Sequence, residues 1–119
     1  MIDTAGLNAA LGDAHRRIDV EAWTNVYVVG DVHGCLTELE TLLDRLSPTD
    51  DELVVFVGDL VRKGPDSAGV VERVRSRPNS LTVRGNNEEK LLRGEKTVDS
   101  LDDDDLSWLA DQPVAISWD

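Results

Sequence analysis

The sequence predicts an α/β fold built on a mainly parallel sheet. Three short apolar runs, at 26–29, 53–57 and 80–83, are each followed by a glycine within two residues. Helical patterns or helix-capping residues follow these runs, and strands that alternate with helices favour a parallel sheet. A fourth apolar run begins at 113–118, so we expect the sheet to be incomplete within this chain.

Each predicted helix depends on a local pattern. Between Cys35 and Leu46, leucines recur at steps of three and four residues, which indicates an amphipathic helix. Asp66 or Ser67 can cap a second helix. One or two helical turns are expected at 88–92. The acidic run at 99–105 lacks the spacing of a calcium loop and is typical of a solvated helix start.

A chain of 119 residues has the length of one domain. Residues 1–22 are weakly patterned, and we expect an N-terminal extension in which Leu7, Leu11 and Ile18 can line one side of a short helix. Residues 23–119 are predicted to form a single, partial domain.

The composition narrows the function classes. The 24 acidic and 12 basic residues give a net charge of −12, which repels a phosphate backbone, so we expect no nucleic-acid partner. The chain lacks a membrane-length apolar run and a signal-peptide pattern, so we expect no membrane partner and a cytoplasmic location. The 16 Asp against 8 Glu favour a salt-adapted, halophilic-type surface, whose Tm would rise in molar KCl; an ordinary acidic surface is the alternative.

Polar side chains follow each of the three predicted strands. Asp31 and His33 follow the first strand, Asp59 the second and Asn86 the third, at nearly equal intervals and beside glycines. Because the carboxyl ends of parallel strands meet at one edge of a sheet, we expect these four side chains to converge there. Two carboxylates, an imidazole and an amide oxygen suit first-row divalent metals such as Mn, Fe or Zn.

The three motifs resemble those of the calcineurin-like metallophosphoesterase superfamily. They are Gly-Asp-Val-His-Gly at 30–34, Gly-Asp-Leu-Val-Arg-Lys-Gly-Pro-Asp-Ser at 58–67 and Gly-Asn-Asn-Glu at 85–88. The second is similar to that of dinucleoside tetraphosphatases and serine/threonine phosphoprotein phosphatases. The resemblance covers roughly residues 26–118 and implies the N-terminal half of the metallophosphatase β-sandwich, flanked by helices.

The resemblance also implies roles for individual residues. Asp31 and His33 would bind one metal ion, Asp59 would bridge two, and Asn86 would bind the second. Such a pair of ions activates water for in-line hydrolysis of a phosphoester or phosphoanhydride. Arg62 and Lys63 are candidates for binding the phosphate, with Lys63 standing where related proteins usually have arginine.

Two departures from the family pattern bear on activity. Asn87 stands where the family has its general-acid histidine, and an amide cannot donate that proton, so we identify no intact catalytic acid. The family completes both metal sites with C-terminal histidines, whereas this sequence has only His15 and His33. We therefore expect a truncated chain with weak or no activity alone, or one completed by a partner chain that supplies histidines.

Two functions from different classes remain open. The first is a metal-dependent phosphoesterase acting on a phosphomonoester, a phosphoprotein or a dinucleoside polyphosphate. The second is a non-catalytic, degenerate half-domain that binds a partner through an unfinished sheet. Metal-dependent hydrolysis that is lost in Asp59→Ala would distinguish the first from the second.

Overall fold

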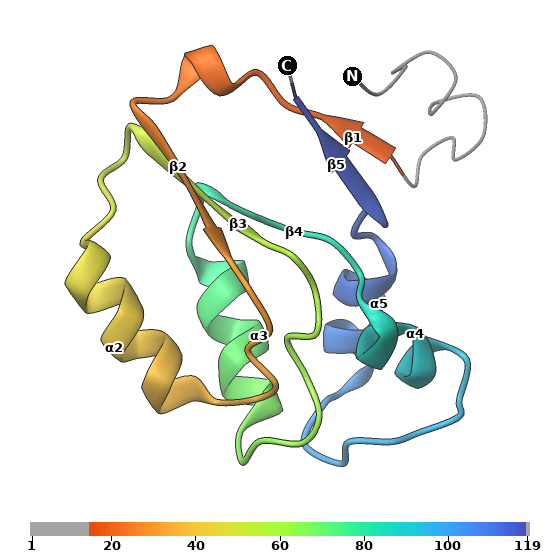
Figure 1. The fold of residues 1–119 in the computed structure, drawn as a ribbon. Helices are drawn as coiled ribbons and strands as arrows, with labels where there is room; N and C mark the ends of the chain where they lie inside the picture. Colours follow the sequence, from red (N-terminus) through yellow and green to blue (C-terminus); the bar gives the residue numbers. More distant parts are fainter. Residues whose placement is uncertain (1–14, 119) are drawn as a thin grey trace.

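Three parallel strands form the main sheet of the protein, seen in a computed structural model that describes residues 15–118. They are β2 (Asn25–Val29), β3 (Glu52–Phe56) and β4 (Ser80–Thr82), in the order β2-β3-β4 (Figure 1). Val29 pairs with Phe56, and Phe56 pairs with Thr82, so the carboxyl ends of the strands meet at one edge. The predicted α/β fold is confirmed, and the three strands end within one residue of their predicted limits.

Two helices cover one face of this sheet. They are α2 (Leu36–Leu46) and α3 (Ser67–Ser76), and both lie on the same side of β2 and β3 (Figure 1). The leucine stripe of α2 places Leu39 and Leu43 in the main core, as the sequence predicted. Asp66 caps α3 by accepting a hydrogen bond from the N–H of Gly69 at 2.8 Å.

Both faces of β3 are buried, which explains why its sequence is a continuous apolar run. Val54 and Phe56 point toward the helices, and Leu53 and Val55 pack in a second, smaller cluster on the opposite face. That opposite face is only partly covered, as the 55% exposure of Val28 shows.

A second, two-stranded sheet was not predicted. Its strands are β1 (His15–Arg17) and β5 (Ala115–Ser117), which are parallel, and the 3₁₀ helix η2 (Val20–Ala22) follows β1. Two of the three β1 residues are exposed arginines, so β1 has no apolar run that sequence analysis could detect.

Part of the predicted N-terminal extension therefore packs against the domain. Ile18 follows β1 and packs with Leu53 and Val55, rather than lying in the suggested short helix. Leu7 and Leu11 lie outside the described residues. The domain boundary at residue 23 stays a prediction.

Two short helices follow β4. α4 (Asn86–Leu92) begins at the edge where the strands end, and α5 (Asp103–Ala110) precedes β5. Asp102 caps α5 by accepting a hydrogen bond from the N–H of Asp105 at 2.8 Å, so this acidic run starts a helix as predicted. Among the described residues, no helix has the length and apolar character needed to cross a bilayer.

Candidate metal centre

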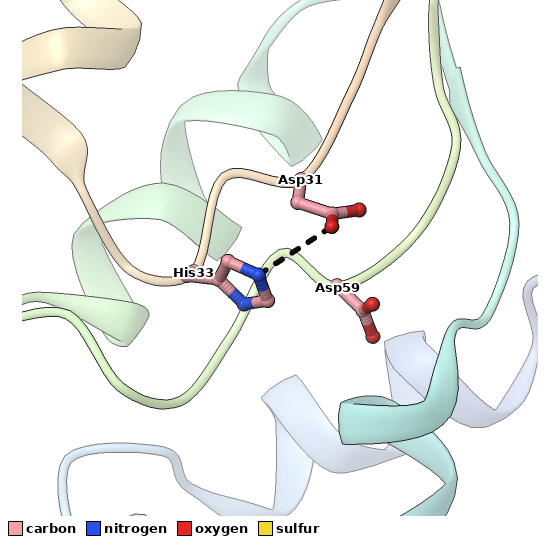
Figure 2. A group of neighbouring side chains, drawn as sticks. All are labelled: Asp31, His33 and Asp59. Carbon is pink, nitrogen blue, oxygen red and sulfur yellow. Dashed lines mark ion pairs between the residues drawn. The ribbon is translucent and has the colours of Figure 1, made fainter.

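Three of the four predicted metal ligands come together at the carboxyl edge of the sheet. Asp31 and His33 lie in the loop after β2, and Asp59 lies in the loop after β3 (Figure 2). One ligand atom from each of the three side chains lies within 4.8 Å of the other two. His33 Nε2 is 3.6 Å from Asp31 Oδ2. The predicted convergence of these three residues is therefore observed.

Backbone hydrogen bonds hold the two loops against each other. The N–H of His33 donates to the carbonyl oxygen of Asp59 at 2.8 Å, and the N–H of Gly34 donates to that of Leu60 at 2.7 Å. The side chains of His33 and Asp59 are thus positioned by direct contact between their own backbones.

Several residues of these loops adopt left-handed backbone conformations, which are uncommon for residues other than glycine. His33 has φ +50°, Asp59 +51°, and Arg62 and Lys63 both +71°. Such conformations cost about 1–3 kcal/mol each and cluster at functional sites, where the surrounding structure compensates for them. Apart from the neighbouring glycines, no residue pattern in the sequence indicated this strain.

Two glycines allow the loops to approach closely. A Cβ atom on Gly64 would lie 2.0 Å from the carbonyl oxygen of His33. A Cβ atom on Gly85 would lie 2.5 Å from Asp59 Oδ1 and 2.6 Å from the backbone N of Asp59. The third motif can therefore lie directly against Asp59 only because it begins with glycine.

The start of α4 brings the two asparagines of the third motif to this edge. Asn86 is the first residue of α4 and is exposed, immediately after the glycine that contacts Asp59. Asn87 is 4% exposed, and its N–H donates to Asp59 Oδ1 at 3.0 Å. The fourth predicted ligand, Asn86, thus lies beside the other three, and its part in metal binding stays a prediction.

Asn87 also connects the candidate metal ligands to a predicted phosphate-binding residue. Its side chain is 3.2 Å from His33 Nδ1 and accepts a hydrogen bond from Arg62 at 2.8 Å. Lys63 is exposed in the same loop. The sequence identified Asn87 only as a missing catalytic acid and did not reveal these contacts.

Glu88 lies in the first turn of α4 and bonds to the residue that precedes this helix. It is fully buried, and its Oε1 accepts a hydrogen bond from the N–H of Gly85 at 3.0 Å. Burial raises the pKa of this carboxyl above its ordinary value, although hydrogen bonds from backbone N–H groups oppose the rise. Glu88 therefore fixes the turn that presents Asn86 and Asn87.

The donor set of this edge fits a divalent metal ion. Two carboxylates and one imidazole offer the oxygen and nitrogen ligands that suit Mn, Fe or Zn. The exposure of the Asp31 side chain, at 57%, leaves a path from solvent. The three side chains would hold the ion, and exposed Asn86 is the nearest predicted source of a further oxygen.

Comparison with known proteins identifies similar sequences. The model of the calcineurin-like phosphoesterase family matches residues 24–116. Serine/threonine-protein phosphatase 1 of Salmonella typhimurium is 42% identical over 82 residues, which are 67% of this chain and 37% of that protein. A symmetrical bis(5'-nucleosyl)-tetraphosphatase of Pectobacterium atrosepticum is 42% identical over 107 residues, which are 76% of this chain and 38% of that protein.

Solved structures show the same fold. A crystal structure described as a diadenosine tetraphosphatase superposes with a TM-score of 0.75 at 34% identity, covering 87% of this chain and 49% of that one. A serine/threonine phosphatase from Saccharomyces cerevisiae superposes with a TM-score of 0.67 at 18% identity, which shows likeness of fold alone. The chain spans less than half the length of each of these relatives.

Proposed function

This chain belongs to the calcineurin-like phosphoesterase family, and we propose that it contributes to the metal-dependent hydrolysis of a phosphoester or phosphoanhydride. The observation that carries the proposal is the grouping of Asp31, His33 and Asp59 within 4.8 Å. When bound there, a divalent ion would act as a Lewis acid toward phosphoryl oxygen and activate water for in-line attack.

Different residues at this edge would bind the metal ions and the phosphate. Asp31, His33 and Asp59 would hold metal, with Asn86 adding an amide oxygen for a second ion. Arg62 and Lys63 would contact the phosphate oxygens, because both lie in the loop that carries Asp59 and both are cationic. Among these groups none serves as a general acid, so substrates with good leaving groups would be favoured.

Two substrate classes follow from the relatives. One is named as a protein phosphatase and the other as a dinucleoside tetraphosphatase. We therefore propose a phosphorylated substrate drawn from phosphomonoesters, phosphoproteins and dinucleoside polyphosphates. A cytoplasmic location and a divalent ion drawn from Mn, Fe and Zn are further parts of this proposal.

A complete two-metal site would need histidines from outside this chain. His15 is 7% exposed and forms a 2.7 Å hydrogen bond with Ser117 between β1 and β5, so it is committed to the smaller sheet. His33 is the other histidine of the sequence. We propose that another polypeptide segment supplies the remaining ligands and that the chain alone has weak activity.

A second candidate function is a non-catalytic interaction module. It is favoured by the partly uncovered face of the main sheet, where Val28 is 55% and Val57 45% exposed. A partner that packs on this face would bury both side chains, and association through it is compatible with an inactive metal centre.

The test is hydrolysis of p-nitrophenyl phosphate with Mn²⁺ in molar KCl. We expect weak turnover that requires Mn²⁺ and is lost in Asp59→Ala. The matched control is Asp44→Ala, which removes an exposed aspartate from α2 and should leave turnover unchanged. Circular dichroism establishes that all three proteins are folded.

The outcomes separate the two functions. Turnover that is independent of metal, or equal in Asp59→Ala, would contradict the phosphoesterase proposal. A folded chain that shows neither turnover nor Mn²⁺ binding would favour the interaction module. Bis(5'-nucleosyl) tetraphosphate and a phosphoserine peptide, assayed side by side, would distinguish the substrate classes.

A further inference from the structure

A chain of hydrogen bonds links the candidate metal centre to Arg62 through one buried amide. Arg62 lies in the loop after β3, Asn87 in the first turn of α4 and His33 in the loop after β2. The Arg62 guanidinium is 2.8 Å from Asn87 Oδ1, and Asn87 Nδ2 is 3.2 Å from His33 Nδ1. Asn87 is 4% exposed, so water does not readily replace either bond.

The direction of each bond follows from the chemistry of the groups. A guanidinium has donors and no acceptor, so the Asn87 atom that faces Arg62 must be the carbonyl oxygen. The other end of the amide is then the NH₂ group, and it faces His33. An NH₂ group can only donate, so Nδ1 of His33 must accept with its lone pair.

We propose that Asn87 is a positioning residue that, together with Arg62, sets the tautomer of His33. With its lone pair at Nδ1 engaged, the neutral ring carries its proton on Nε2, the nitrogen 3.6 Å from Asp31 Oδ2.

This tautomer opposes metal binding. A ligating histidine offers a free lone pair from one nitrogen while the other ring N–H donates to an acceptor. In His33 the Nδ1 lone pair faces the Asn87 NH₂ group, and Nε2 carries the proton. Binding through either nitrogen therefore requires that the Asn87 amide turn or withdraw, which breaks its bond with Arg62.

The first test measures the tautomer in metal-free protein and does not depend on the proposed function. Long-range ¹H–¹⁵N NMR spectra at about pH 8, where histidine rings are ordinarily neutral, distinguish a protonated from an unprotonated ring nitrogen. With two histidines in the sequence, His15→Gln assigns the signals. We expect Nδ1 of His33 to be unprotonated in the wild type and protonated in Asn87→Asp, whose carboxylate accepts from both Arg62 and His33.

The second test measures metal affinity and rests on the proposed metal site. Both Arg62→Met and Lys63→Met remove one positive charge, but only the first releases the Asn87 oxygen. We expect Arg62→Met to bind Mn²⁺ about 10-fold more tightly than Lys63→Met by calorimetry, because supporting contacts of metal ligands typically change affinity 10- to 100-fold. Asn87→Asp should also bind more tightly than the wild type.

The outcomes of the two tests are distinguishable. A wild-type His33 protonated at Nδ1, or an unchanged tautomer in folded Asn87→Asp, would overturn the proposal. Equal affinities of Arg62→Met and Lys63→Met would overturn its consequence for metal binding. If the tautomers are as expected and no variant binds Mn²⁺, the role of Asn87 stands and the proposed function fails.

Discussion

Carboxylates lie at both ends of the β2–β3 strand pair, but they differ in how many hydrogen-bond donors surround them. At the amino end, Glu52 accepts hydrogen bonds from Asn25 at 2.7 Å, Tyr27 at 2.9 Å and the N–H of Thr49 at 2.8 Å. At the carboxyl end, Asp31 and Asp59 lie near each other and His33, and the Asp31 side chain is 57% exposed.

The difference separates structural from functional carboxylates. Three donors stabilise the charge of Glu52, so this side chain ties β2, β3 and the preceding turn together. Two aspartates brought together in strained loops repel each other and gain from a cation between them. Grouped acids with few donors are thus candidates for binding a metal ion, whereas the many donors around Glu52 give it a structural contact.

The largest expected effect at the carboxyl end of the strand pair comes from replacing Gly85 by a larger residue. Gly85→Ala would place its Cβ 2.5 Å from Asp59 Oδ1, forcing α4 away from the loop after β3. We expect a loss of about 1–3 kcal/mol in unfolding free energy, as for other overpacked sites, and weaker Mn²⁺ binding. Chemical denaturation and calorimetry measure the two effects.

The matched control is Gly30→Ala at the end of β2. A Cβ atom there would have no neighbour within 4 Å, so stability and metal affinity should stay close to those of the wild type. Equal behaviour of the two alanine variants would show that α4 does not depend on close contact with Asp59.

A smaller effect is expected from Glu52→Gln at the amino end. The substitution replaces one carboxylate oxygen by an NH₂ group, which cannot accept a hydrogen bond. Either the donors of Asn25 and Tyr27 or the N–H of Thr49 then lose their acceptor. We expect Tm to fall by several degrees while Mn²⁺ affinity is unchanged. A loss of metal affinity in folded Glu52→Gln would refute the independence of the two ends.

Lowering the pH should reduce the difference in unfolding free energy between the wild type and Glu52→Gln. Hydrogen bonds from the N–H of Thr49, and then from Asn25 and Tyr27, lower the pKa of Glu52 from 4.5 to about 2. The lowered pKa stabilises the fold fully above about pH 4.5, and this contribution is lost as pH falls toward 2. Unfolding curves at several pH values should therefore converge in acid, and a difference that stays constant down to pH 2 would contradict this account.

The smallest expected effect is a gain in stability from a substitution at the carboxyl end of the strand pair. Asp59→Asn keeps an oxygen to accept the N–H of Asn87 but removes one of two neighbouring negative charges. Without metal we expect a gain of about 1 kcal/mol or less in unfolding free energy, since unit charges some 4 Å apart interact by about that much in water. The gain should shrink in molar KCl, and a lower Tm in dilute buffer would argue against repulsion between the aspartates.

Much of this fold could be predicted because its core elements have strong local patterns. The apolar run of β3 and the leucine stripe of α2 are both signals of burial, and both elements were predicted within one residue at each end. β1 escaped prediction because three residues with two exposed arginines have no detectable period, and pairing with β5 is a contact distant in sequence.

The candidate site was predictable in part for a similar reason. Parallel strands bring their carboxyl ends together, so residues just after each strand, such as Asp31 and Asp59, must lie at one edge. The contacts of Asn87 depend on the turn at Gly85 and on the left-handed conformation of Arg62. Those features arise from packing between loops, which no local pattern in the sequence encodes.

Mn²⁺ titration followed by electron paramagnetic resonance determines whether Asp31, His33 and Asp59 bind a metal ion together. We expect saturable binding in the wild type and in Glu52→Gln, and a loss of at least about 100-fold in affinity in folded Asp59→Ala. Equal Mn²⁺ binding by Asp59→Ala and the wild type would contradict a metal site formed by these three residues.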